Sequence, residues 1–148
     1  MIIDCHGHYT TAPQAAGVTP PPYPDIADDD IRGSVAGSQL KMMNERGIDL
    51  TIFSQRASAM EHHAGDEAVS RRWAEISNNL ISRVVGLYPG SFAGVCQLPQ
   101  SPGVPIERSV PELRRCVEEL GFVGCNLNPD PSGGRPSMSA RPRKRPQW

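Results

Sequence analysis

Two histidines lie close together near the amino terminus, in the segment IIDCHGHYT. His6 and His8 are two positions apart, so in an extended strand both side chains point to one face, their Cβ atoms separated by roughly 6.6 Å. The imidazoles can then converge on a single ion at zinc–nitrogen distances of about 2.0–2.1 Å, if Gly7 lets the strand end and open. The spacing therefore predicts a metal site, with capping of an exposed strand end as the alternative.

A catalytic zinc usually has three protein ligands and one water, so two histidines leave the ligand set incomplete. The candidates for a third ligand are His62, His63, Asp130 and Cys5. Cys5 has the wrong parity, and neighbouring His62 and His63 would point apart, so at most one of them faces the site. Asp4 lies so close to the pair that we expect a supporting or structural carboxylate there rather than a base.

Polar side chains also follow the other apolar segments. Arg56 comes after IDLTIFS, and its planar guanidinium suits a substrate carboxylate, although a surface ion pair with Asp66 or Glu67 is an equal alternative. Asn126 and Asn128 share a face of FVGCNLN and could hydrogen-bond a ligand, but asparagine before proline is also ordinary turn chemistry. We therefore predict substrate contacts at these positions and assign no catalytic residue.

Short apolar strands alternate with amphipathic helices along most of the chain. The predicted strands cover residues 2–6, 48–54, 92–99 and 122–128, and helices lie between them. This order predicts right-handed crossovers and a parallel sheet. The order therefore predicts an α/β fold of the (βα)8 TIM-barrel type. A closed barrel of this type needs about 250 residues, so we expect the 148 residues to form an incomplete barrel of about four βα units.

Local signals place the helix ends. Asp28 is the expected N-cap of the first helix and Gly47 its stop. Ser109 and Glu112 match a capping box at the start of the last helix. The expected inner face of that helix consists of Val110, Leu113, Val117 and Leu120.

The formal net charge of −1 conceals a division of the chain into two parts. Residues 135–148 contain five basic residues and no acid, whereas residues 1–134 have 10 basic against 16 acidic residues, a net charge of −6. The acidic part argues against a nucleic-acid surface. We predict a half-barrel domain at residues 1–134 and a disordered, basic, Pro/Arg-rich tail at 135–148, with a nucleic-acid or membrane arm as the less favoured alternative.

Four cysteines lie in apolar stretches, and no signal peptide precedes them. This pattern favours reduced thiols and a cytoplasmic location. No apolar run approaches the roughly 20 residues that a membrane-spanning helix needs.

Several segments together resemble the amino-terminal half of the 4-oxalomesaconate hydratases, a branch of the amidohydrolase superfamily related to aminocarboxymuconate semialdehyde decarboxylase. The resemblance covers nearly all of residues 1–134 and rests on IIDCHGHYT, ERGIDLTIFSQRAS, EHHAGD, QLPQSPGV and GFVGCNLNPDPSGG. The HxH motif is common to the superfamily, whereas QRAS and NLNPDPSGG are more specific to the hydratase branch.

This resemblance implies a zinc-dependent barrel enzyme of aromatic catabolism, in the protocatechuate and gallate routes. Such a hydro-lyase adds water across the double bond of an unsaturated keto tricarboxylic acid, so the implied partner is a small-molecule carboxylate substrate. His6 and His8 match the first two metal ligands of the family, and Arg56 lies where a substrate carboxylate could be held.

The same resemblance implies what the chain lacks. In such enzymes the third histidine ligand and the acidic residue that handles protons come from the second half of the barrel, so we expect this truncated chain to be catalytically silent. A related decarboxylase or hydrolase, and a non-catalytic half-barrel fragment, remain the alternatives. An open half-barrel also exposes two sheet edges and one face, which could lead to self-association.

Overall fold

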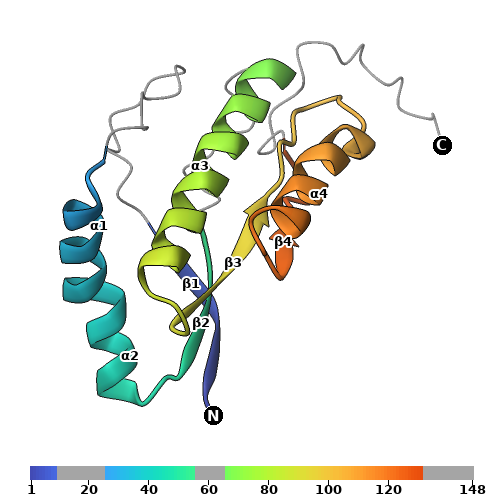
Figure 1. The fold of residues 1–148 in the computed structure, drawn as a ribbon. Coiled ribbons are helices and arrows are strands. Elements are labelled where there is room, and N and C mark those ends of the chain that lie inside the picture. Colours follow the sequence, from blue (N-terminus) through green and yellow to red (C-terminus); the bar gives the residue numbers. More distant parts are fainter. Residues whose placement is uncertain (10–25, 56–65, 132–148) are drawn as a thin grey trace.

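The computed structural model describes residues 1–9, 26–55 and 66–131 of the chain. Its elements alternate as the sequence predicts (Figure 1). In chain order they are β1 (Ile3–Tyr9), α1 (Asp28–Val35), the π-helical η1 (Ala36–Leu40), α2 (Lys41–Arg46), β2 (Leu50–Gln55), α3 (Glu67–Leu87), β3 (Phe92–Gln97), the 3-10 helix η3 (Ile106–Ser109), α4 (Val110–Glu118) and β4 (Gly124–Asn126).

All four strands are parallel and lie in the order β1-β2-β3-β4. Figure 1 shows α1, α3 and α4 side by side in front of this sheet, and α3 contacts both β2 and β3. A strand order that follows the chain, with each helix on the same side, is the arrangement of consecutive units in a βα barrel. The prediction of an α/β partial barrel is therefore confirmed.

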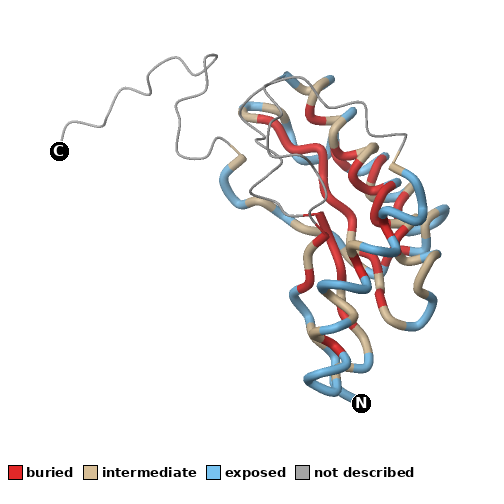
Figure 2. Tube along the Cα trace, turned by 90° about the vertical axis from the view of Figure 1, so that its left-hand side faces the viewer, coloured by how far each residue is buried: buried red, intermediate tan, exposed pale blue. Residues whose placement is uncertain are grey.

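The apolar core lies between the sheet and this helical layer. Phe53 of β2 is fully buried, and its ring centroid is 4.5 Å from that of Phe92 on β3. Ile81 and Val84 of α3 are also fully buried and belong to the same cluster. In Figure 2 the buried positions follow the strands and the helix surfaces that face them. Each such side chain stabilises the fold by about 1.5–3 kcal/mol relative to exposure.

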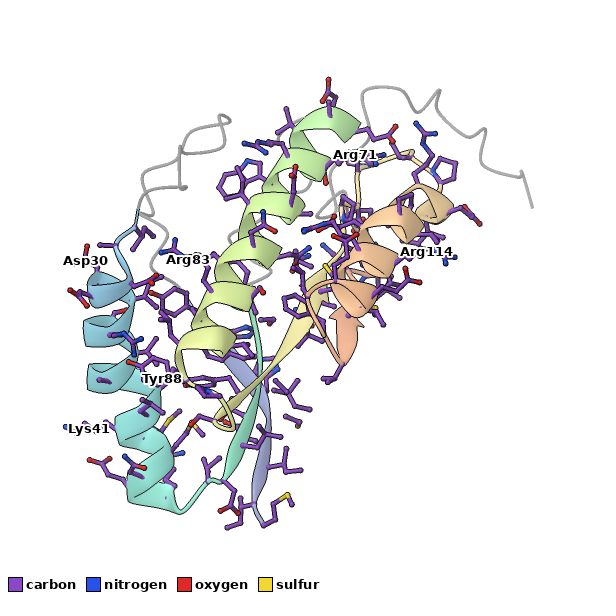
Figure 3. The ribbon with its side chains drawn as sticks, viewed as in Figure 1. Asp30, Lys41, Arg71, Arg83, Tyr88 and Arg114 are labelled. Atoms are coloured by element: carbon purple, nitrogen blue, oxygen red, sulfur yellow. The ribbon has the colours of Figure 1, made fainter. Side chains whose placement is uncertain are left out.

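The ends of the first helical segment differ in part from the prediction. Ala27, not Asp28, is the N-cap residue, and Asp28 begins α1. Its carboxylate instead accepts a hydrogen bond of 2.6 Å from Arg83 of α3, which is labelled in Figure 3. At the other end Gly47 has φ 65°, the left-handed conformation that ends many helices, so the predicted stop is confirmed.

The predictions for α4 were wrong for the cap and only half right for the inner face. The Ser109 side chain makes no capping bond to the helix; its hydroxyl donates to the carbonyl oxygen of Pro99 instead. The buried residues of α4 are Glu112 and Cys116, while Val110 and Val117 are exposed. Leu113 and Leu120 pack against the core as predicted, whereas a buried ion pair, described below, takes another part of the inward face.

Among the described residues, no helix is both long enough and apolar enough to cross a lipid bilayer. The predicted tail at 135–148 lies outside the residues that the structure describes.

Candidate metal centre

The two histidines belong to the second half of β1. This strand continues to Tyr9 and does not end at His6, so Gly7 does not open the chain as predicted. The Tyr9 hydroxyl is 3.0 Å from Ser34 Oγ of α1, which places Tyr9 on the helical side of the sheet. Because side chains alternate along a strand, His8 points to the opposite face.

The imidazole rings of His6 and His8 meet edge to face. Their centroids are 4.5 Å apart with an interplanar angle of 81°, and the two Nε2 atoms are separated by 3.0 Å. At metal–nitrogen distances of about 2.0–2.1 Å, this separation corresponds to an angle of roughly 94° at a shared cation. The two nitrogens therefore fit one divalent metal ion as neighbouring ligands.

A register shift in β1 creates this arrangement. Asp4 pairs with Thr51 and Gly7 with Phe53, so β1 has one more residue than β2 across the interval. Gly7 is required there, because a Cβ atom at this position would collide with Thr51 Cγ2. The Asp4 carboxylate accepts a hydrogen bond of 3.0 Å from the backbone N–H of His6. Asp4 thus supports the backbone of the bulge, consistent with the predicted structural carboxylate.

Contacts from two other elements fix His8. Its Nδ1 is 3.1 Å from Ser54 Oγ, on the neighbouring strand β2. Its carbonyl oxygen accepts a hydrogen bond of 3.2 Å from Gln39 Nε2, in the π-helical segment η1. Metal-binding histidines commonly bond their second ring nitrogen in this way. In the sequence Ser54 is recognisable only as a polar residue at a strand end.

Two of the candidate third ligands, His62 and His63, lie outside the described residues, and the other two, Asp130 and Cys5, lie within them. Arg56, the predicted substrate contact, also lies outside the described residues. Within the described ranges, no three or more His, Cys, Asp or Glu side chains are grouped so that they could hold a metal ion. Among the described residues, His6 and His8 are therefore the two candidate ligands that lie together.

The two asparagines at the end of β4 have different environments. Asn126 is half-buried and pairs in register with Gln97 of β3. The Asn128 side-chain oxygen accepts from the Asp130 N–H, which is the turn chemistry considered as its alternative role. The main chain of Asn128 is held by Gln100, whose side-chain amide bonds both its N–H and its carbonyl oxygen at 2.7 Å.

A cavity of about 340 Å³ lies beside the Gln100–Asn128 contact, between the segments that follow β3 and β4. Its lining includes Val104, Ile106 and Leu127 together with several prolines. Gln100 and Ser109, which also line it, have their side chains bonded to main-chain atoms. The cavity therefore presents a largely apolar surface.

Between the sheet and the helices, a buried polar network joins β3 to α3 and α4. The Asn78 side chain bonds both backbone groups of Gln97, at 2.7 and 3.1 Å, and donates to Glu112 Oε1 at 2.8 Å. Arg115 makes two further bonds to the Glu112 carboxylate, at 2.7 and 2.9 Å. Burial alone would raise the pKa of Glu112, but the bonds from Arg115 and Asn78 outweigh it and lower that pKa.

Two thiols adjoin the network. Cys96 and Cys116 are fully buried and unoxidised, and Cys116 Sγ lies 3.5 Å from Glu112 Oε1. The hydrogen bond with Cys96, together with burial, holds the pKa of Cys116 far above its usual range. These thiols are therefore structural rather than nucleophilic. Sequence reasoning missed the network, because a Glu and an Arg on a helix ordinarily indicate a solvent-facing surface.

Comparison with known proteins places this geometry in a family. The family model described as amidohydrolase matches residues 3–143. The chain belongs to the amidohydrolase family. Its parallel βα units are therefore those of an amidohydrolase barrel, as the resemblance implied.

Individual relatives agree with this placement. The chain is 56% identical over 147 residues to 2-keto-4-carboxy-3-hexenedioate hydratase from Sphingobium sp., covering 90% of this chain and 43% of that protein. The crystal structure of 4-oxalomesaconate hydratase from Rhodopseudomonas palustris matches with a TM-score of 0.79 and 50% identity, again over 90% of this chain and 43% of that one. This amidohydrolase chain thus spans less than half the length of either relative.

A more distant structure comes from a decarboxylase. Dihydroxybenzoic acid decarboxylase from Polaromonas sp., crystallised with bound manganese and the inhibitor 2-nitroresorcinol, matches with a TM-score of 0.61 and 27% identity. The match covers 84% of this chain and 37% of that one. The hydratases are therefore much more similar to this chain than the decarboxylase is.

Proposed function

We propose that the chain is the amino-terminal half of a metal-dependent hydratase barrel that acts on 4-oxalomesaconate. Two observations support this proposal: the 3.0 Å approach of the His6 and His8 Nε2 atoms, and the 56% identity to a hydratase over 90% of the chain. The reaction adds water to an unsaturated keto tricarboxylic acid, in the breakdown of aromatic compounds. The decarboxylase reading is the alternative, with lower sequence similarity.

His6 and His8 would hold the metal through their Nε2 atoms. A divalent metal bound there supplies Lewis-acid activation of water or of a substrate oxygen. Zinc is the metal we propose, since histidine nitrogen is among its usual ligands. Manganese in the distant decarboxylase makes that ion the comparison to test.

The remaining residues have a proposed role in substrate binding. Arg56 would bind a substrate carboxylate through its planar guanidinium. Asn126 would hydrogen-bond the substrate from the end of β4, where it is half-buried. For Asn128 the structure favours the turn, because its side-chain oxygen is already engaged by Asp130.

Metal binding is the direct test of the site. Purified protein is equilibrated with Zn²⁺ or Mn²⁺, desalted, and analysed for metal by plasma mass spectrometry. We expect the parent protein to retain more metal than His6→Ala and His8→Ala, with a loss of at least tenfold in affinity in each variant, because each removes one of the two proposed ligands. Unchanged metal content in both variants would remove the ligand assignment.

Hydration of 4-oxalomesaconate is measured separately by chromatography. We expect no turnover from the 148-residue chain alone, because it spans 43% of the hydratase to which it is similar, and the resemblance implies that the third ligand and the proton-handling acid come from the other half of the barrel. Zinc-dependent turnover would show that the chain forms a complete site, with its third ligand supplied from residues such as His62 or His63.

Self-association is the further proposal for this half-barrel. Val123 and Leu127, which flank the open strand β4, are 65% and 62% exposed, and Val117 of α4 is 49% exposed. The open edges of β1 and β4 could pair as parallel strands of two copies. Light scattering coupled to gel filtration tests this directly: a monomer at all concentrations would reject it.

A further inference from the structure

The Ser54 hydroxyl contacts one histidine of the proposed metal site. Ser54 is 3% exposed and pairs in register with His8, and its Oγ lies 3.1 Å from His8 Nδ1. Within the described part of the chain, this ring nitrogen is the partner of the hydroxyl. A hydroxyl can donate or accept, and a neutral imidazole has one nitrogen of each kind, so the two groups determine each other's roles.

Without metal, one assignment of protons is consistent with the Ser54–His8 and His8–His6 contacts and lets the buried hydroxyl donate. The buried Ser54 hydroxyl donates to His8 Nδ1, so His8 carries its proton on Nε2. That Nε2–H donates to His6 Nε2 across 3.0 Å, and the exposed His6 ring can direct its own Nδ1–H to water. A buried hydroxyl that failed to donate would lose about 1 kcal/mol or more.

Metal binding requires the opposite assignment at His8. Both Nε2 lone pairs must then point at the cation, so the His8 proton has to lie on Nδ1. There it can donate to Ser54 Oγ, and the hydroxyl hydrogen turns away from the ring. No net proton is gained or lost by His8 in this exchange; one proton leaves Nε2 for water and one from water joins Nδ1.

We propose that Ser54 is a positioning residue that selects the tautomer of His8. When the hydroxyl donates to Nδ1, the His8 proton lies on Nε2 and bonds His6. When the hydroxyl accepts from Nδ1, the Nε2 lone pair of His8 is available to bind metal. This inference rests on the proposed metal site. It predicts that metal uptake is accompanied by a reversal of the Ser54–His8 hydrogen bond.

Three variants separate the hydroxyl's two roles. Ser54→Ala removes both roles, Ser54→Thr retains both, and Ser54→Asp provides a carboxylate that can only accept. By titration calorimetry with Zn²⁺, we expect Ser54→Ala to weaken binding about tenfold and Ser54→Asp to strengthen it about tenfold. Ser54→Thr should remain within about threefold of the parent. Equal affinities for the parent and Ser54→Ala would overturn the proposal, once circular dichroism shows both to be folded.

The tautomer itself is read by ¹⁵N NMR of histidine-labelled protein. In the metal-free parent we expect His8 to carry its proton on Nε2, and after Zn²⁺ addition on Nδ1. Metal-free Ser54→Asp should already carry it on Nδ1. A metal-free parent with the proton on Nδ1 would also overturn the proposal.

The two measurements fail independently. If Zn²⁺ does not bind the parent protein, the proposed function fails, but the metal-free spectra of the parent and of Ser54→Asp still decide which role the hydroxyl has. If Zn²⁺ binds and those spectra are identical, Ser54 does not position His8 and the metal site stands without it.

Discussion

The histidine pair on β1 and the Asn78–Glu112–Arg115 network between β3 and the helices use polar side chains in opposite ways. In the network, the Glu112 carboxylate accepts bonds from both Asn78 and Arg115 and is 8% exposed. In the pair, two Nε2 atoms point at each other from an exposed and a half-buried ring. A polar group surrounded by protein partners stabilises the fold, whereas two ring nitrogens that approach each other near solvent form a candidate site for an ion.

The largest expected effect on stability comes from a substitution in the Asn78–Glu112–Arg115 network that leaves the histidine pair unchanged. Glu112→Ala leaves Arg115 without its buried partner, so we expect the free energy of unfolding to fall by about 3–5 kcal/mol. Urea denaturation measures this loss. Glu118→Ala is the matched control, because its pair with Arg114 is exposed and worth at most about 1 kcal/mol. Comparable losses in both variants would contradict the contrast between buried and exposed pairs.

A smaller effect is expected from a substitution in the backbone bulge that positions the histidine pair. Gly7→Ala places a methyl group against the Thr51 side chain, and we expect a loss of about 1–3 kcal/mol together with weaker Zn²⁺ binding. Gly86→Ala is the control, since nothing lies within 4 Å of its Cβ position in α3 and alanine favours helix by about 1 kcal/mol. Unchanged Zn²⁺ affinity in Gly7→Ala would separate the bulge from the site.

The stability that Glu112 contributes depends on pH. The pKa of Glu112 is lowered in the folded protein, so its contribution is complete above the unfolded pKa of about 4.5 and is lost as the pH falls through the folded value. The stability difference between the parent and Glu112→Gln, measured in urea at several pH values, should therefore be constant near neutrality and narrow below about pH 4.5. A difference that widens in acid would reverse the sign of this linkage.

The smallest effect concerns the thiols. Cys5 and Cys125 are exposed, whereas Cys96 and Cys116 are buried. In native protein we expect iodoacetamide to modify Cys5 first and Cys125 more slowly, since burial and the neighbouring Cys96 raise the pKa of Cys125. Cys96 and Cys116 should react only after denaturation. Peptide mass spectrometry resolves the four rates, and rapid native labelling of Cys116 would contradict the assigned burial.

Sequence periodicity predicted the alternation of strands and helices well, because each strand is a short apolar run ended by turn residues. It also identified the histidine pair, since two residues of spacing place both rings on one side. The bulge between Asp4 and Gly7 was not predictable, because a register shift depends on the neighbouring strand. Glu112 was misassigned for a similar reason: its partner Asn78 is 34 positions away in the chain.

The order of the strands has a consequence for how the chain acquires its structure. Ile3 pairs with Leu50, Thr51 with Phe92 and Val95 with Gly124, so each pairing closes a loop of a single βα unit. No pairing among the described strands joins the first unit to the last. Nearest-neighbour contacts of this kind carry modest loop-closure costs, so each unit can dock on its predecessor during synthesis, from the amino terminus onward.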